Sequence, residues 1–135
     1  MNRKIDKIQE IEKFLEELTS VLPSDFEEYK SDFKIKAICE RYFEKIIEAV
    51  IDLAFIIIKD KGLKIPEEDK EAFDILVKEK IISEKLAEKL RDAKGMRNII
   101  AHEYGKIDDE IIFEAITTEL EKDIEEFIED IKKCH

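Results

Sequence analysis

Residues that interrupt helices are scarce in this sequence, and their scarcity limits the folds open to the chain. Only 3 glycines and 2 prolines occur among 135 residues, while hydrophobic and charged residues each make up 44%. Lysine, glutamate, isoleucine and leucine dominate, which favours long helices joined by short loops. No segment has the alternating pattern of a strand. The sequence therefore predicts an all-α fold: one domain, residues 1–135, forming an antiparallel bundle of four to five helices.

Apolar residues recur every three or four positions, as they do on the buried face of a helix. The first helix is predicted over residues 2–22, the second from 24 to about 61 with a bend near 31–32, and three more begin near 66, 83 and 108. The predicted boundary residues are Asn2, Ser24 with Glu27, Gly62, Pro66, Ser83, and Asp108 or Asp109.

The segment 37–58 is apolar over most of its circumference, unlike the other predicted helices. A helix of this kind must be covered on more than one side. We therefore expect it to be the central helix, and the excess of apolar surface suggests that a second copy of the protein covers part of it. This predicts a homodimer.

The net charge of −11 argues against a simple nucleic-acid-binding surface, which is usually basic. The charge is unevenly distributed, however. Six bases and three acids lie between Lys85 and Lys106, a local charge of +3, which leaves −14 for the rest of the chain.

No apolar run reaches the roughly 18 residues of a membrane span, and the first residues lack the apolar core of a signal peptide. Cys39 and Cys134 are far apart and belong to no CxxC motif, so neither a disulfide framework nor a zinc site is expected. Cys39 lies in an apolar segment and is expected in the core. The chain is thus predicted to be cytoplasmic, with no membrane association, metal or cofactor.

Chemically versatile side chains are concentrated between Arg97 and Tyr104, with Asn98 and His102 between them and glycines at 95 and 105. On a regular helix Asn98 and His102 share a face, whereas Arg97 and His102 are about 140° apart. Two explanations are open: the helix ends near His102, or residues of two protomers meet in a composite site across a two-fold axis.

This set of residues suits cleavage of an RNA phosphodiester bond. A histidine that titrates near neutral pH can remove the proton from a ribose 2′-hydroxyl. An arginine can hold the phosphate through two parallel hydrogen bonds and stabilise developing charge, with no need for a metal. Asn98 can orient the imidazole, bind a ligand, or bond the backbone at a turn.

The run 97–102, Arg-Asn-Ile-Ile-Ala-His, resembles the Arg–polar–x–x–x–His signature of the HEPN superfamily of all-helical proteins, many of which are ribonucleases. With Tyr104 it reads Arg-x4-His-x-Tyr and resembles the HepT-like branch. The similarity extends over most of the chain. It includes Glu40-Arg41, Pro66, Ile81-Ile82 before Leu86, Gly95-Met96, and Gly105-Lys106-Ile107-Asp108.

The resemblance implies a homodimeric, metal-independent endoribonuclease toxin of a type VII (HEPN/MNT) toxin–antitoxin module. In such proteins the residues matching Arg97 and His102 are catalytic and come from both protomers at a composite dimer-interface site. The partner is an MNT-type nucleotidyltransferase antitoxin. It attaches AMP to the motif tyrosine, here Tyr104, and this AMPylation silences the toxin.

Other interpretations of the same residues remain open. An arginine and a histidine on one helix are often only a solvated face, and a tyrosine beside a glycine often packs a helix end. Arg41 is expected to form an ion pair on its helix face rather than act as a second catalytic group. The alternative function is a non-catalytic adaptor that binds the nucleotidyltransferase, and a third is a dimer that holds a nucleotide phosphate at Arg97.

Overall fold

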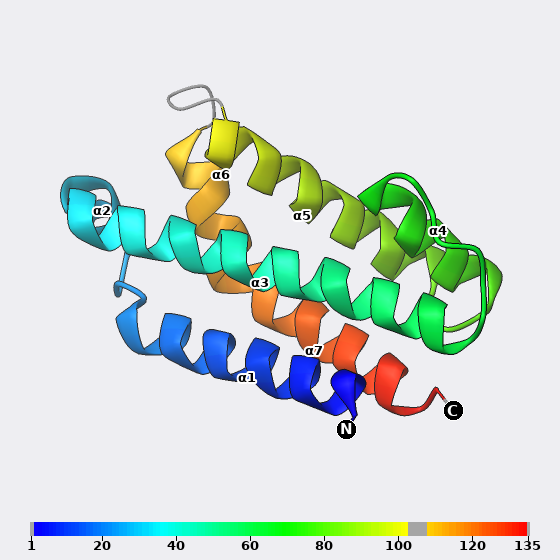
Figure 1. Ribbon diagram of the computed structural model, residues 1–135. Coiled ribbons are helices and arrows are strands. Elements are labelled where there is room, and N and C mark those ends of the chain that lie inside the picture. The colour runs from blue at the N-terminus through cyan, green and yellow to red at the C-terminus, as the bar shows by residue number, and fades with distance from the viewer. Residues whose placement is uncertain (1, 103–107, 135) are drawn as a thin grey trace.

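The computed structural model describes residues 2–102 and 108–134, and within them every regular element is a helix. The predicted all-α bundle is confirmed (Figure 1). The helices are α1 (Arg3–Val21), α2 (Phe26–Ser31), α3 (Phe33–Asp60), α4 (Asp69–Lys78), α5 (Glu84–His102), α6 (Asp109–Glu114), the π-helical turn η1 (Ala115–Glu119) and α7 (Leu120–Lys132).

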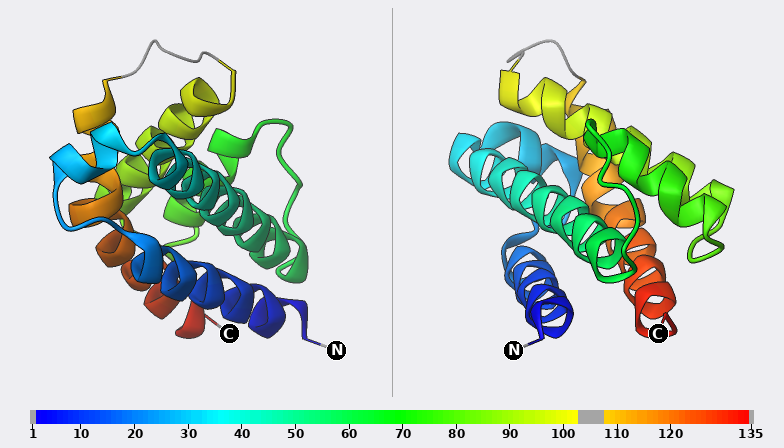
Figure 2. Two further views of the ribbon diagram at one scale, coloured as in Figure 1. Left: turned by 90° about the vertical axis from the view of Figure 1, so that its left-hand side faces the viewer. Right: turned by 45° about the vertical axis from the view of Figure 1, so that its right-hand side comes forward.

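The long helices run in alternating directions (Figures 1 and 2). α3 crosses the middle of the bundle, with α1 on one side and α5 on the other. The continuous run of α6, η1 and α7 lies behind it, and the two termini are at the same end. The short α4 packs beside the second half of α3 and the first half of α5. α3 is therefore the central helix, as predicted, and it packs directly against α5.

Local capping explains most of the helix boundaries. The side chains of Asn2, Ser83 and Asp108 accept hydrogen bonds from the backbone N–H groups at the starts of α1, α5 and α6, as predicted. Asp32 caps α3 in the same way, so the predicted bend near residues 31–32 is a complete break between α2 and α3. That break accounts for one more helix than the four to five expected. After α3, the positive φ of Gly62 allows the chain to turn.

Two helix starts predicted from the sequence were wrong. Asp25, not Ser24, is the N-cap of α2, and its side chain accepts a hydrogen bond from the Glu28 N–H. Glu28 rather than Glu27 accepts the hydrogen bond from the Ser24 N–H. Pro66 precedes α4 by three residues, since the helix begins at Asp69.

The last helix is continuous but not uniformly α-helical. The predicted run from 108 to 131 contains the π-helical turn η1, in which one extra residue per turn is accommodated. The sequence does not reveal this turn, because the apolar residues keep a spacing of three or four positions through it. The buried residues on either side of the turn and within it are Ile112, Ile116, Leu120 and Ile124.

The apolar surface of α3 is covered mainly by the chain itself. Eleven of its residues are buried, including Cys39, which fits the predicted core position. Burial raises the pKa of the Cys39 thiol to about 11, which keeps it protonated and unreactive at neutral pH. At the N-terminal end of α3, however, Phe33 and Ile38 are 77% and 43% exposed. The most exposed large apolar residues of α3 thus lie at one end of the helix, and the predicted dimer contact remains a prediction.

The start of α6 is tied to α3 by an ion pair between Asp109 and Lys36, 2.8 Å apart. Next to this pair, burial raises the pKa of the Glu40 carboxyl, and repulsion from Asp109 and Glu44 adds to the effect, while Lys36 opposes it.

Replacing Glu40 by glutamine is expected to stabilise the protein at neutral pH. Because the folded-state pKa lies above the unfolded value, the native state binds the proton more tightly, and ionisation of Glu40 costs stability as pH rises through the raised pKa. Melting curves should show Glu40→Gln a few degrees above wild type at pH 7, with the gain fading toward about pH 4. The exposed Glu16→Gln serves as control; a lower Tm for Glu40→Gln at pH 7 would contradict this account.

Within the residues that the structure describes, no helix is both long enough and apolar enough to cross a membrane.

Candidate active site

The candidate site is built on the second half of α5. This helix continues without interruption through Gly95 and ends, among the described residues, at His102. The structure therefore places Arg97, Asn98 and His102 on a single helix, as the sequence predicts. Tyr104, the predicted modification site, lies outside the described residues.

Arg97 points from α5 toward α3, and its side chain is 22% exposed. Its Nη2 donates to Glu48 Oε1 on α3 at 2.7 Å, and its Nη1 donates to Asn98 Oδ1 at 3.0 Å. The Nε is buried and has no hydrogen-bond partner among the described residues. The guanidinium is therefore held between two helices, with part of its hydrogen-bonding capacity unused.

Asn98 is engaged with cations rather than with the histidine. Its Oδ1 accepts a second hydrogen bond, from Lys94 Nζ at 3.3 Å, and Lys94 also lies 3.7 Å from Asp69, the first residue of α4. With the carbonyl oxygen committed in this way, only the Asn98 amide N–H groups remain for a ligand or an imidazole. In the structure Asn98 thus orients Arg97, and its predicted role in orienting His102 remains a prediction.

His102 lies at the last position of α5 and is exposed. None of the hydrogen bonds that Arg97 makes with described residues goes to His102. Five helix positions separate the two residues, so the angle of about 140° expected from the sequence applies here. Both side chains belong to one end of α5, but they do not converge on one point within a single protomer.

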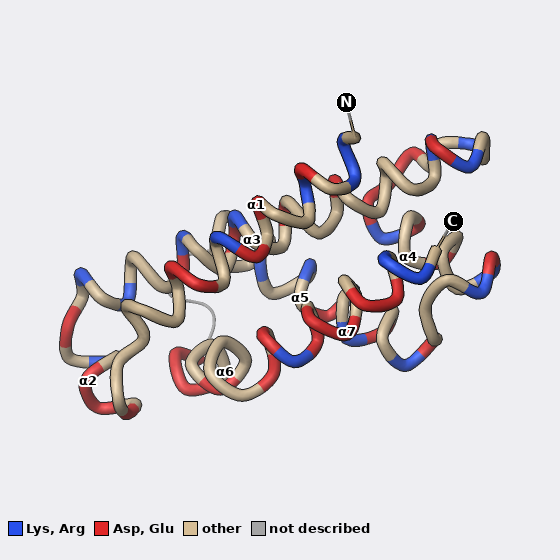
Figure 3. The backbone as a smooth tube through the Cα atoms, turned by 90° about the horizontal axis from the view of Figure 1, so that it is seen from below, with Lys and Arg blue, Asp and Glu red and all other residues tan. Residues whose placement is uncertain are grey.

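The charge along α5 follows the sequence-based prediction. Among residues 84–102, five bases oppose three acids, whereas the 13 residues of α7 carry six acids and two bases. Figure 3 shows Asp and Glu residues, in red, along much of α6 and α7. The motif thus lies on the least acidic helix of an acidic protein, which reduces the repulsion that a phosphate would meet there.

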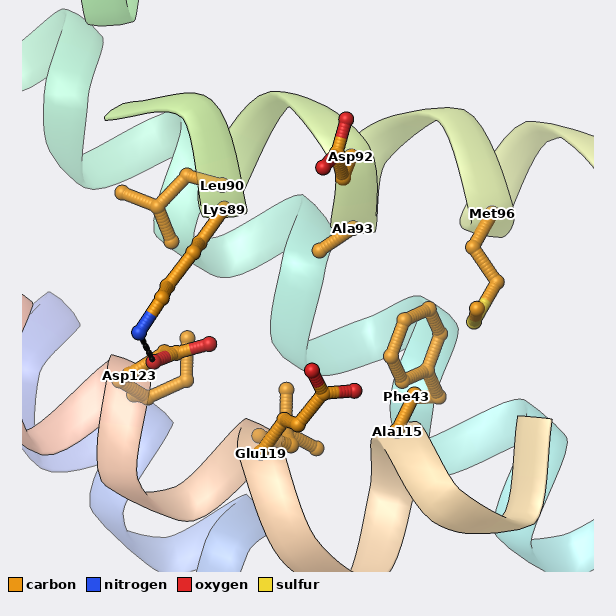
Figure 4. A pocket seen from close by; sticks show the side chains of 11 residues that line it. Phe43, Lys89, Leu90, Asp92, Ala93, Met96, Ala115, Glu119 and Asp123 are labelled. Carbon is orange, nitrogen blue, oxygen red and sulfur yellow. Dashed lines mark ion pairs between the residues drawn. The ribbon is translucent and has the colours of Figure 1, made fainter. Parts of the chain in front are cut away.

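A pocket of about 110 Å³ lies on another side of α5, facing η1 and α7 (Figure 4). Phe43 of α3 and Met96 contribute apolar surface, and Lys89 pairs with Asp123 across it at 3.5 Å. Arg97, Asn98 and His102 do not line this pocket. It is therefore separate from the candidate site.

Arg41 forms the ion pair predicted for it, with Glu44 one turn along α3 at 3.6 Å. Sequence reasoning missed the partners of the motif: Glu48, Lys94 and Asp69. A usable signal existed for Glu48, an acidic residue between Ile47 and Ala49 in the most apolar stretch of the chain. A carboxylate in such a position usually has a nearby cation.

Comparison with known proteins identifies chains of similar sequence and fold. The chain is 30% identical over 128 residues to the mRNA nuclease HepT of Shewanella oneidensis, covering 95% of each protein. It is 29% identical over 116 residues to the tRNA nuclease HepT of Aphanizomenon flos-aquae, covering 86% of this chain and 79% of the relative. A solved structure of the tri-AMPylated Shewanella oneidensis HEPN toxin in complex with MNT antitoxin superposes with a TM-score of 0.90 at 30% identity, covering 98% of this chain and 99% of that one.

A helical bundle with this arrangement, carrying Arg-x4-His at the end of one long helix, is a HEPN-type domain. The family model described as "Ribonuclease HepT-like" matches residues 6–131. The chain belongs to the HepT-like ribonuclease family.

Proposed function

We propose that this chain is the endoribonuclease toxin of a type VII toxin–antitoxin module and acts in the cytoplasm without a metal. The observation that carries the proposal is that the least acidic helix carries both a partly exposed Arg97, held by two neighbours, and an exposed His102. Membership of the HepT-like ribonuclease family and the nuclease names of its relatives support the reaction class.

The reaction follows from the two side chains. His102 in its neutral form takes the proton of a ribose 2′-hydroxyl. The 2′-oxygen then attacks the adjacent phosphorus and the bond to the 5′-oxygen breaks, giving a 2′,3′-cyclic phosphate and a 5′-hydroxyl end once that oxygen is protonated. Arg97 binds the non-bridging phosphate oxygens and stabilises their growing charge.

Because Arg97 and His102 diverge on α5, we propose that the working site is composite. Arg97 of one protomer faces His102 of the other across a two-fold axis, so that the homodimer completes each site. The exposed apolar residues Phe33 and Ile38 on α3 provide surface for such a contact.

We further propose that an MNT-type nucleotidyltransferase silences the toxin by transferring AMP to the Tyr104 hydroxyl, with release of pyrophosphate from ATP. In this sequence Tyr104 follows His102 by two residues, so an added phosphate there would place negative charge within two residues of the proposed catalytic histidine. The tri-AMPylated state of the Shewanella toxin supports this assignment.

The rival function, a non-catalytic adaptor for the nucleotidyltransferase, is favoured by one observation, the net charge of −11, which suits a basic protein partner better than RNA. Expression in cells separates the two functions. The ribonuclease predicts growth arrest by the chain alone, relief by a co-expressed MNT-type nucleotidyltransferase, and no arrest by His102→Ala. The adaptor predicts no arrest in any of these cases.

The modification gives a separate expected result. Tyr104→Phe should still arrest growth, but the nucleotidyltransferase should no longer relieve the arrest, because the acceptor hydroxyl is gone. Intact mass should show AMP increments on the wild-type chain and none on Tyr104→Phe. Increments that persist on the phenylalanine variant would place the modification elsewhere.

A further inference from the structure

The Arg97 guanidinium is held by a carboxylate that no sequence motif includes. Glu48 lies near the middle of α3, and its Oε1 accepts a hydrogen bond from Arg97 Nη2 at 2.7 Å across the α3–α5 contact. The pair joins the central helix of the bundle to the helix that carries the candidate site. It is the contact through which the rigid core can control the direction of Arg97.

The arrangement of donors favours orientation over simple neutralisation. Glu48 and Asn98 each take one N–H, from Nη2 and Nη1 respectively, so each Nη atom retains a second N–H group for an anion. Asn98 is in turn held by Lys94, which pairs with Asp69 of α4. The guanidinium plane is thus fixed from two directions by groups on three helices.

The solvent exposure of the Glu48–Arg97 ion pair indicates a role in activity rather than in stability. The Glu48 side chain is 42% exposed and that of Arg97 is 22% exposed. Ion pairs with this degree of solvent access contribute little to the free energy of unfolding. Loss of such an ion pair, in contrast, frees the long arginine side chain. Substrate binding must then order that side chain, which lowers activity.

We infer that Glu48 is the positioning residue of Arg97 and holds the guanidinium in the orientation in which it binds the scissile phosphate. This inference rests on the proposed ribonuclease function. Its opposite is that Glu48 shields Arg97 and competes with the phosphate. The two differ in sign, because removal of a positioning group lowers activity and removal of a competitor raises it.

The test compares Glu48→Ala, Glu48→Gln and wild type in steady-state RNA cleavage. Alanine should lower kcat by about 10- to 100-fold, because Arg97 would no longer be held in the orientation that binds the phosphate, with KM changed by less than about threefold. Glutamine keeps an acceptor oxygen at the same reach and should recover activity to within about fivefold of wild type. The Tm of both variants should stay close to that of wild type, and Glu48→Ser replaces the alanine variant if that variant does not fold.

Glu44 provides the matched control. It lies one turn before Glu48 on α3 and pairs with Arg41 instead of Arg97. Glu44→Ala should leave kcat and KM unchanged. An equal loss in both alanine variants would indicate a general effect of charge on this face of α3 and would overturn the inference.

A spectroscopic measurement keeps the inference separate from the proposed function. NMR of the arginine side chains should show distinct, slowly exchanging Nη signals for Arg97 in wild type and Glu48→Gln, and averaged signals in Glu48→Ala. If the wild-type chain does not cleave RNA, the proposed function fails, and these signals alone decide whether Glu48 orients Arg97. Glu48→Ala with wild-type or higher cleavage, or with Arg97 signals unchanged, refutes the inference.

Discussion

Replacing Arg97 or His102 by alanine is expected to reduce RNA cleavage by about 10³-fold or more in a buffer that contains EDTA. Removing His102 takes away the base for the 2′-hydroxyl, a group that typically contributes 10²- to 10⁴-fold. Removing Arg97 takes away the cation that meets the developing phosphate charge, with a cost of similar size. The rates should be measured on a defined RNA, and the products examined for 2′,3′-cyclic phosphate ends.

Controls for this experiment come from the same chain. Arg41→Ala removes an exposed arginine that pairs only with Glu44 among the described residues, and it should leave the rate unchanged. EDTA should also leave the wild-type rate unchanged, because neither proposed role requires a metal. Substantial activity in either Arg97→Ala or His102→Ala, with both proteins folded, would refute the assignment of roles.

The fold follows closely from the sequence because helix signals are local. Apolar spacing and single capping residues such as Ser83 and Asp108 act over one or two turns, and the structure confirms both. The errors occurred where two local signals compete. Ser24 and Asp25 are adjacent residues that can both cap a helix, and Asp32 stops a helix that its apolar neighbours would continue.

The site was less accessible to sequence reasoning. Arg97, Asn98 and His102 are close in the chain, so their spacing on one helix was predictable. The partner of Arg97 was not, because Glu48 is 49 positions away and becomes a neighbour only when α3 packs against α5. The same limit applies to Lys94 and Asp69, whose pairing depends on where α4 begins.

The second prediction with a large expected effect concerns the composite site. Arg97→Ala and His102→Ala should each form inactive homodimers. A heterodimer of the two variants keeps Arg97 on one protomer and His102 on the other, so one complete site remains if the catalytic pair forms in trans. Such a dimer should recover activity to within about tenfold of wild type, since one of its two sites is intact.

The heterodimer can be made by co-expressing the two variants with different affinity tags and purifying on both in turn. Its dimeric state should first be confirmed in solution, with both parent homodimers assayed at the same concentration. Cleavage restored by the mixed dimer is the result that the composite ribonuclease site predicts. A mixed dimer as inactive as its parents, or a wild-type chain that cleaves RNA as a monomer, would contradict it.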